Sequence, residues 1–195
     1  MLGGADFNEV YNLLGGIKAW GQEVAVGDEM LGLELFTEAE SFTEVLAMAY
    51  ALEEGLKGLY EAMIVEVANP DVQKVFGRLA KMEVEHQRRL YNLYEASEPS
   101  PVNVETFAQM AEPTAAEGGF SIEDYRRRFA ADVSKPDNAI SIAMTIEAQA
   151  MDLYQRAGDD REPGATRDAL LQIAKEEKAH LSYLGELMDD IARDL

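Results

Sequence analysis

Apolar residues recur at intervals of three and four over four long stretches of the chain, and this spacing is typical of amphipathic helices. The pattern therefore predicts an all-α protein. The four helices are expected over residues 37–68, 70–96, 135–158 and 163–191, with Ser41 as an alternative start of the first. In the second helix, the residues expected to face inward are Val72, Val75, Phe76, Leu79, Met82, His86, Leu90 and Leu93.

Two short turns divide the helices into two antiparallel hairpins. Asn69 is a good N-cap and Pro70 a good first helical residue, so the second helix is expected to begin there. Residues 162–164, Glu-Pro-Gly, are expected to form the turn between the third and fourth helices. Residues 97–135 are too long for a plain loop, and a short helix is expected within them over 120–131. A crossover of this kind brings all four long helices together.

The two hairpins repeat each other at an offset of 94 residues. Each contains Glu-x-x-His, and these motifs use the only two histidines of the chain. Each also has a Glu 33 residues before its His and a Tyr seven residues after that Glu. The repeated residues are Glu53, Tyr60, Glu83 and His86 in the first hairpin, and Glu147, Tyr154, Glu177 and His180 in the second.

Helix geometry brings these repeated residues to one level. Residues i and i+3 share a helix face, so each Glu-x-x-His can direct a carboxylate and an imidazole to one point. Glu53 lies 16 residues before Asn69, whereas Glu83 and His86 lie 14 and 17 residues after it. At about 1.5 Å rise per residue, all three are roughly 24 Å from the turn. Two packed hairpins would therefore offer four Glu and two His at one height.

The neighbours of the four Glu residues on their helix faces are apolar, and carboxylates buried there would be costly without compensation. A pair of divalent cations would supply it, and carboxylate and imidazole suit iron, manganese or zinc. The competing interpretation is a solvated polar pair, which is what a single Glu-x-x-His usually represents. The duplication favours metal ligands. For Tyr60 and Tyr154, core packing is the simpler role, and hydrogen bonding to a ligand or radical quenching is the alternative.

Composition narrows the choice of partners. The formal net charge of −20 repels nucleic acid and anionic membranes, so neither is expected as a partner. There is no segment of 18 apolar residues and no basic leader, so a cytoplasmic protein is expected. The absence of cysteine excludes disulfides and a rubredoxin-type Cys₄ iron centre, so electrons for any redox reaction must come from another protein.

Residues 1–36 lie outside the repeat and are expected to form a separate small appendage before a bundle domain over 37–195. Within the appendage, residues 10–20 resemble the last strand, turn and helix of a rhodanese domain. The rhodanese catalytic loop would lie upstream, and its Cys is absent. We therefore expect a truncated rhodanese-like tail and linker that pack against a neighbour without sulfur-transfer activity.

The repeated pattern over residues 37–195 resembles the ferritin-like di-iron carboxylate proteins, and most closely the rubrerythrin family. The resemblance implies a ferritin-like four-helix bundle, with one Glu from each of two helices and a Glu-x-x-His from each of the other two. The implied metal ligands are Glu53, Glu147, Glu83 with His86, and Glu177 with His180.

The resemblance also implies roles. Glu83 and Glu177 would bridge two metal ions, natively iron, with zinc or manganese as substitutes in a crystal. Rubrerythrins proper carry a further Glu where this chain has Ala150, so the site is expected to be more nearly symmetric.

The implied function is that of a di-iron oxidoreductase in oxidative-stress or iron handling, with peroxidase or ferroxidase-like activity that oxidises Fe(II) with peroxide or O₂. It is expected to work as a homodimer, with an exchange of hairpins between protomers as one arrangement, and with an external electron-donor protein. The alternatives are an iron storage or delivery protein without catalytic turnover, and a metal-free structural bundle.

Overall fold

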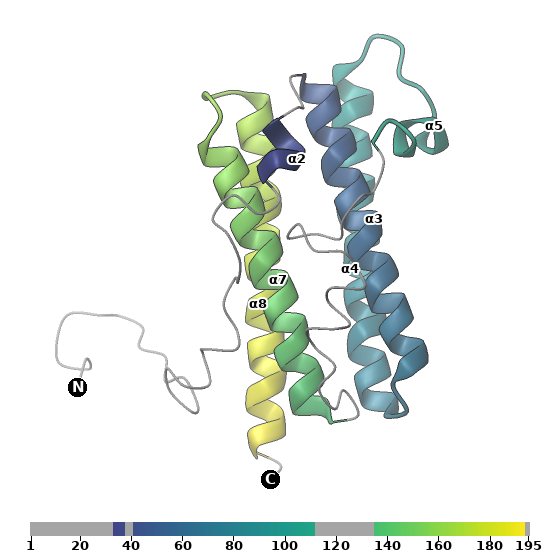
Figure 1. The fold of residues 1–195 in the computed structure, drawn as a ribbon, viewed down its shortest axis with the longest axis vertical. Coiled ribbons are helices and arrows are strands. Elements are labelled where there is room, and N and C mark those ends of the chain that lie inside the picture. The colour runs from purple at the N-terminus through teal and green to yellow at the C-terminus, as the bar shows by residue number, and fades with distance from the viewer. Residues whose placement is uncertain (1–32, 38–40, 112–134, 194–195) are drawn as a thin grey trace, which may run out of the picture.

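The computed structural model describes residues 33–37, 41–111 and 135–193, and these residues form helices joined by short connections. No strand occurs in these ranges, so the predicted all-α bundle is confirmed. The helices are α2 (Leu33–Thr37), α3 (Phe42–Glu66), α4 (Pro70–Ser97), α5 (Val104–Ala108), α7 (Pro136–Asp159) and α8 (Ala165–Arg193) (Figure 1).

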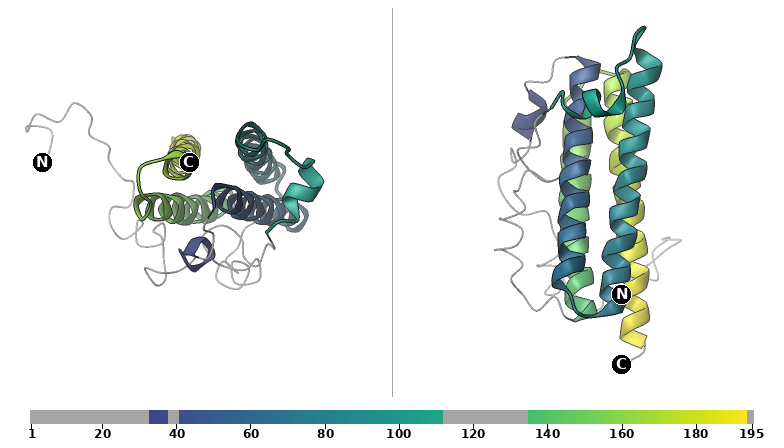
Figure 2. Two further views of the ribbon diagram at one scale, coloured as in Figure 1. Left: turned by 90° about the horizontal axis from the view of Figure 1, so that it is seen from above. Right: turned by 90° about the vertical axis from the view of Figure 1, so that its right-hand side faces the viewer.

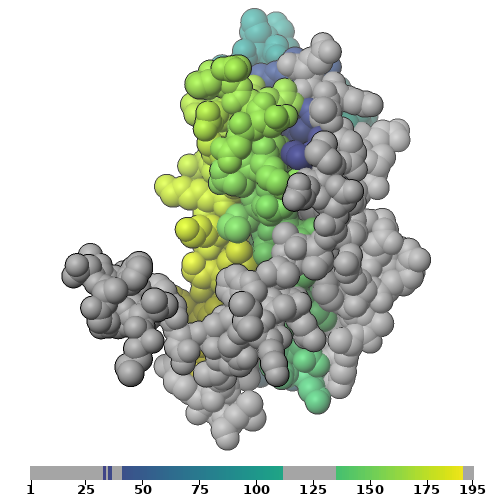
Figure 3. Space-filling model, turned by 60° about the vertical axis from the view of Figure 1, so that its left-hand side comes forward, coloured from purple at the N-terminus to yellow at the C-terminus, as the bar shows by residue number. Residues whose placement is uncertain are grey.

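The four long helices form two antiparallel hairpins that lie side by side. α3 packs along α4 and α7 along α8, while α4 approaches α7 and α3 approaches α8 across the bundle. Seen end-on, α3 and α7 form one layer and α4 and α8 the other (Figure 2). α7 and α8 lie against each other along the visible length of their hairpin (Figure 3). The two repeats of the sequence are therefore the two hairpins of one bundle.

Local capping explains where the first hairpin begins and turns. The Ser41 hydroxyl accepts a hydrogen bond from the backbone N–H of Glu44, whose carboxylate accepts one from the Ser41 N–H, forming a capping box. Asn69 caps α4 by accepting from the N–H of Asp71, and Pro70 is its first residue, as predicted. α8 begins at Ala165, two residues later than expected.

The inward face of α4 differs from the prediction at its last turn. Leu93 is 37% exposed, whereas its neighbour Tyr94 is 3% exposed. The reason is α5, which the helical pattern did not predict. Phe107 of α5 is fully buried and stacks on Tyr94 with ring centroids 4.4 Å apart, so α4 turns this tyrosine inward.

Some predictions fall outside the described residues. The rhodanese-like segment of residues 10–20 and the short helix of 120–131 belong to this group.

α2, at the end of the expected appendage, packs Phe36 against Tyr154 of α7, with ring centroids 6.0 Å apart. Among the described helices, none is long and apolar enough to cross a membrane.

The apolar core is split into two clusters along the bundle axis. The first cluster runs on α3 from Val45 to Leu52 and includes Leu153 of α7. The second begins on α3 at Leu56 and includes Ile146 of α7. The same division holds on α4 and α8, so one level of the bundle between the clusters is lined by polar residues. That level is where the predicted ligands lie.

The capping box gives a test of how the first hairpin is anchored. Replacing Ser41 with Ala removes the acceptor for the Glu44 N–H and should lower the free energy of unfolding by about 1 kcal/mol. The control is Ser182→Ala on α8, an exposed mid-helix position where the change should stay within about 0.5 kcal/mol. Chemical denaturation of both variants measures the difference, and equal effects would rule out the capping box as an anchor.

Candidate metal centre

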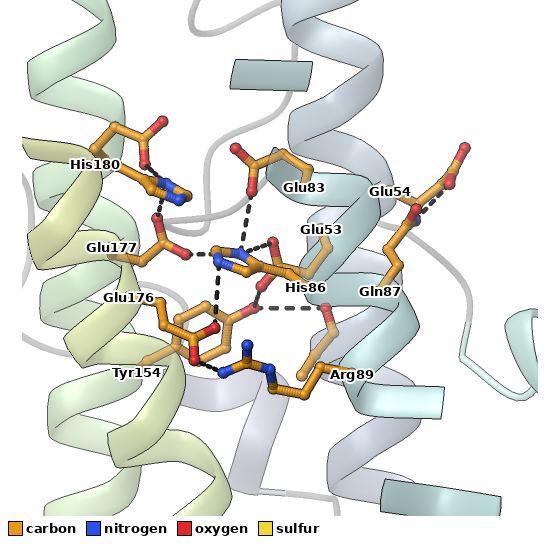
Figure 4. Close-up of polar contacts among 12 residues, drawn as sticks. Glu53, Glu54, Glu83, His86, Gln87, Arg89, Tyr154, Glu176, Glu177 and His180 are labelled. Carbon is orange, nitrogen blue, oxygen red and sulfur yellow. Dashed lines mark hydrogen bonds and ion pairs between the residues drawn. The ribbon is translucent and has the colours of Figure 1, made fainter. Parts of the chain in front are cut away.

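The six predicted ligands converge between the two apolar clusters. Each long helix contributes: one Glu comes from α3, one from α7, and a Glu-x-x-His pair from each of α4 and α8. All four carboxylates have no exposed surface, and the two imidazoles are 4–5% exposed. The residues are Glu53, Glu83, His86, Glu147, Glu177 and His180 (Figure 4 labels all but Glu147).

The two imidazoles stack at the centre, with their ring centroids 4.9 Å apart and an interplanar angle of 7°. Both direct Nδ1 toward carboxylates. His86 Nδ1 lies 3.2 Å from an oxygen of Glu53, 3.2 Å from one of Glu83 and 3.0 Å from one of Glu177 (Figure 4). One Nδ1 atom can carry one hydrogen, so it cannot satisfy three carboxylates at once.

The second half of the site repeats this arrangement in part. His180 Nδ1 lies 2.9 Å from Glu147 Oε2 and 3.0 Å from Glu177 Oε2. Glu177 therefore faces both imidazoles, one with each oxygen, as a residue placed between two metal positions would. One ligand atom from each of Glu83, His86, Glu177 and His180 lies within 4.8 Å of the others.

The two tyrosines cross between the hairpins. Tyr154 of α7 donates a hydrogen bond to Glu53 Oε1 of α3 at 2.9 Å, and Tyr60 of α3 donates one to Glu147 Oε1 of α7. Both rings are fully buried in the apolar core as well. Each tyrosine therefore has both roles: its ring packs in the core, and its hydroxyl donates a hydrogen bond to a carboxylate. In both Glu53 and Glu147, Oε1 accepts the hydrogen bond from the tyrosine and Oε2 faces a histidine.

Glu83 and Glu177 provide the test of whether a metal fits. All four of their carboxylate oxygens are buried, and none has a hydrogen-bond partner of good geometry. The nearest donors are the Nδ1 atoms of the two histidines, and each of these also faces other carboxylates. Buried carboxylates that are poorly satisfied in this way are strongly unfavourable. Because Glu177 faces both imidazoles and Glu83 faces His86, divalent cations bound here would satisfy the oxygens for which the shared imidazole nitrogens do not suffice. The donor set fits the two metal ions that the sequence predicts.

Burial and mutual repulsion set the charge of the carboxylates. Burial raises the pKa of Glu83 well above its usual range, and the nearby Glu147 and Glu177 raise it further. The pKa of Glu147 is raised to about 8 by burial and by the charge of Glu177. Glu177 behaves oppositely: burial would raise its pKa, but the adjacent imidazoles of His180 and His86 lower it.

The histidines are held in their protonated form by the same carboxylates. Burial alone would lower the pKa of His180, but its contacts with the carboxylates of Glu147 and Glu177 outweigh burial and raise the pKa to about 10. The pKa of His86 is also strongly raised: burial opposes this, and the charge of Glu53 is the largest favourable cause. Without metal, therefore, protons take the positions that cations would occupy.

One contact of the site was missed by the sequence reasoning. His86 Nε2, on the side away from the carboxylate cluster, lies 3.4 Å from Glu176 Oε2 of α8 (Figure 4). Glu176 differs from its counterpart in the first hairpin, Met82, so it did not stand out as part of the repeat. Comparing the two repeats identifies only residues that occur in both hairpins, and Glu176 occurs in the second hairpin alone.

The fold and the site together define a class: a helical-bundle protein with a buried carboxylate–histidine cluster suited to two metal ions. A model of the Rubrerythrin family matches residues 44–188, most of the chain and all six predicted ligands. The chain belongs to the rubrerythrin family. No match was found among curated proteins or among solved structures. The family match begins after the rhodanese-like segment, which stays a prediction.

Metal binding should release protons. With pKa values of about 8 and about 10, Glu147 and His180 hold protons at pH 7 that a metal ion must displace, and the raised pKa of His86 and of Glu83 favours further protons at the site. We expect at least two protons to leave when two divalent ions bind, and the apparent affinity to rise with pH between pH 6 and pH 8. Calorimetry in buffers of different ionisation enthalpy counts the protons. Binding without proton release would contradict the assigned ligands.

The tyrosine contacts predict an effect on metal affinity. Tyr154→Phe removes the hydrogen bond that orients Glu53 and should weaken metal binding by about 10- to 100-fold, the usual effect of losing a residue that orients a ligand. The control is Tyr91→Phe, which removes the same hydroxyl from a half-buried tyrosine bonded to the Val102 carbonyl, outside the site. Competition with a chelator measures both variants, and equal affinities would show that Tyr154 only packs.

Proposed function

We propose that this chain is a non-haem di-iron protein of rubrerythrin type, which oxidises Fe(II) with reduction of peroxide or O₂. The observation that supports it most directly is the pair of buried carboxylates, Glu83 and Glu177, whose oxygens have no hydrogen bond of good geometry. The same observation favours a metal centre over a metal-free structural bundle, because protons can neutralise these carboxylates but leave their oxygens poorly hydrogen-bonded.

The residues divide into two equivalent sets. Glu53 with His86 would hold one ion, and Glu147 with His180 the other. Glu83 and Glu177 would bridge them. Two adjacent iron ions would each supply one electron, which is the chemistry that reduction of O₂ or peroxide requires. Within the proposed site, Ala150 is fully buried and offers no further carboxylate, so the two halves present the same ligand types.

The protein's own groups would prepare the site in three ways. The apolar clusters on either side exclude bulk water, which strengthens every electrostatic contact inside. Tyr60 donates a hydrogen bond to one oxygen of Glu147, and Tyr154 donates one to an oxygen of Glu53. These bonds fix the direction of the two carboxylates. Glu147 and His180, with pKa values of about 8 and about 10, carry protons at neutral pH when no cation is bound, so they can take up and release protons as the charge at the site changes.

Other features of the proposal concern partners. Because the chain has no cysteine, we propose that a separate protein donates the electrons. A homodimer is proposed from the family, and a cytoplasmic location from the sequence, which has no segment of 18 apolar residues and no basic leader. Both hairpins of one chain meet at the site, so an exchange of hairpins between protomers is not needed to assemble the six ligands.

Iron titration of matched variants tests the site and the activity together. The wild-type apoprotein should bind two Fe(II) per chain, and anaerobically loaded protein mixed with H₂O₂ or with O₂ in a stopped-flow instrument should oxidise both irons. Glu53→Ala should abolish stoichiometric binding. Glu54→Ala should not, because the neighbouring Glu54 is exposed and is bonded to Lys57 and Gln87 instead.

The ratio of the two oxidation rates distinguishes peroxidase-like from oxidase-like chemistry. Binding that saturates well below two irons per chain, or a Glu53→Ala variant that binds as the wild type does, would overturn the proposal.

A further inference from the structure

The two repeats place the same types of ligand inside the site, but they differ on its outer side. The residues around Glu176 show this. Gln172, Glu176 and Arg89 form one polar group where α8 meets α4, outside His86. The residues at the same positions of the opposite repeat, 94 residues away, are Arg78, Met82 and Tyr183.

Glu176 is held so that one oxygen is free for His86. Its Oε1 accepts a hydrogen bond from Gln172 Nε2 at 2.6 Å and pairs with the Arg89 guanidinium. Its Oε2 faces His86 Nε2 at 3.4 Å. This separation is an ion-pair contact, and a shift of about 0.5 Å would make it a hydrogen bond of ordinary length. The Glu176 side chain is 17% exposed, so water screens it only in part.

The opposite face lacks this carboxylate. There the Arg78 guanidinium lies over the Tyr183 ring, 4.0 Å from its centroid, in a cation–π contact. Met82, at the position equivalent to Glu176, packs against the apolar cluster with Tyr183. A thioether carries no charge and is only a weak acceptor, so it cannot replace a carboxylate as the partner of an imidazole N–H.

A carboxylate behind one histidine changes how that histidine binds metal. A neutral imidazole carries its hydrogen on one nitrogen and offers the lone pair of the other. A hydrogen bond from Nε2–H to Glu176 places the lone pair of His86 on Nδ1, the atom that faces the carboxylate cluster. Such a carboxylate also fixes the ring and raises the basicity of the ligand nitrogen.

We propose that Glu176 is a positioning residue for His86, and that it makes the metal position beside His86 bind more tightly than the position beside His180. This inference rests on the proposed di-metal site. It predicts two unequal binding steps in a site whose six ligands are matched in type.

Cobalt titration tests the inequality. Co²⁺ can be followed by its visible absorption and competed with a chelator, so each of two dissociation constants can be measured. In the wild type we expect two steps. In Glu176→Gln we expect the tighter step to weaken by about 10- to 100-fold and the other to stay within about twofold. Equal weakening of both steps would indicate a general loss of negative charge and would overturn the proposal.

The matched control is Glu85→Gln. It makes the same chemical change one residue from His86 in the chain, but Glu85 is exposed and pairs with Arg88. Its two constants should match those of the wild type. An effect as large as that of Glu176→Gln would also overturn the role of Glu176.

A double-mutant cycle shows whether Glu176 acts through the imidazole. Once His86→Gln has removed the ring, adding Glu176→Gln should cause no further loss of affinity. An additive loss would mean that Glu176 acts elsewhere. Circular dichroism of each variant confirms that the bundle is folded. A wild-type protein that binds fewer than two cobalt ions overturns the metal centre itself, whereas two bound ions with no selective effect overturn the role of Glu176 alone.

Discussion

The structure depends on neutralising four carboxylates inside an apolar bundle. Moving an ion from water into such a core costs several kcal/mol even after relaxation. The site has two ways to become neutral. Without metal, the two imidazolium groups offset carboxylate charge, and the raised pKa values of Glu83 and Glu147 favour the neutral, protonated form of those two carboxyls. With two divalent cations and neutral imidazoles, four positive charges offset four negative ones. The same side chains can therefore be buried in both states.

This constraint explains the layout of the core. A single continuous apolar core would leave no level at which carboxylates from all four helices could meet. The chain instead builds two apolar clusters, with Leu52 and Leu56 on either side of Glu53 in α3. Close packing of each cluster fixes the heights of the helices relative to one another. The polar level between them is therefore positioned by apolar contacts.

Much of this arrangement could be predicted from the sequence because it depends on local signals and on spacing. The cap and first residue of α4, Asn69 and Pro70, set the turn, and counting residues from that turn placed Glu53 and His86 at one height. What could not be predicted depends on packing between distant segments. Tyr94 turns inward because Phe107 lies against it, and no periodicity within α4 contains that information.

The tyrosines illustrate the same limit. The sequence shows that each tyrosine follows its Glu, Glu53 or Glu147, at the same spacing. It does not show that each tyrosine donates a hydrogen bond to the Glu of the other hairpin. That follows from how α3 and α7 are placed in the assembled bundle. The pairing is reciprocal, so neither hairpin has a complete ligand environment alone. Each supplies a hydroxyl to the carboxylate of its partner, and the polar contacts that orient the ligands form only when the hairpins pack together. The two copies of the duplicated sequence therefore agree at the ligands and tyrosines where they meet, and they differ at outer positions such as Glu176 and Met82, which face different neighbours.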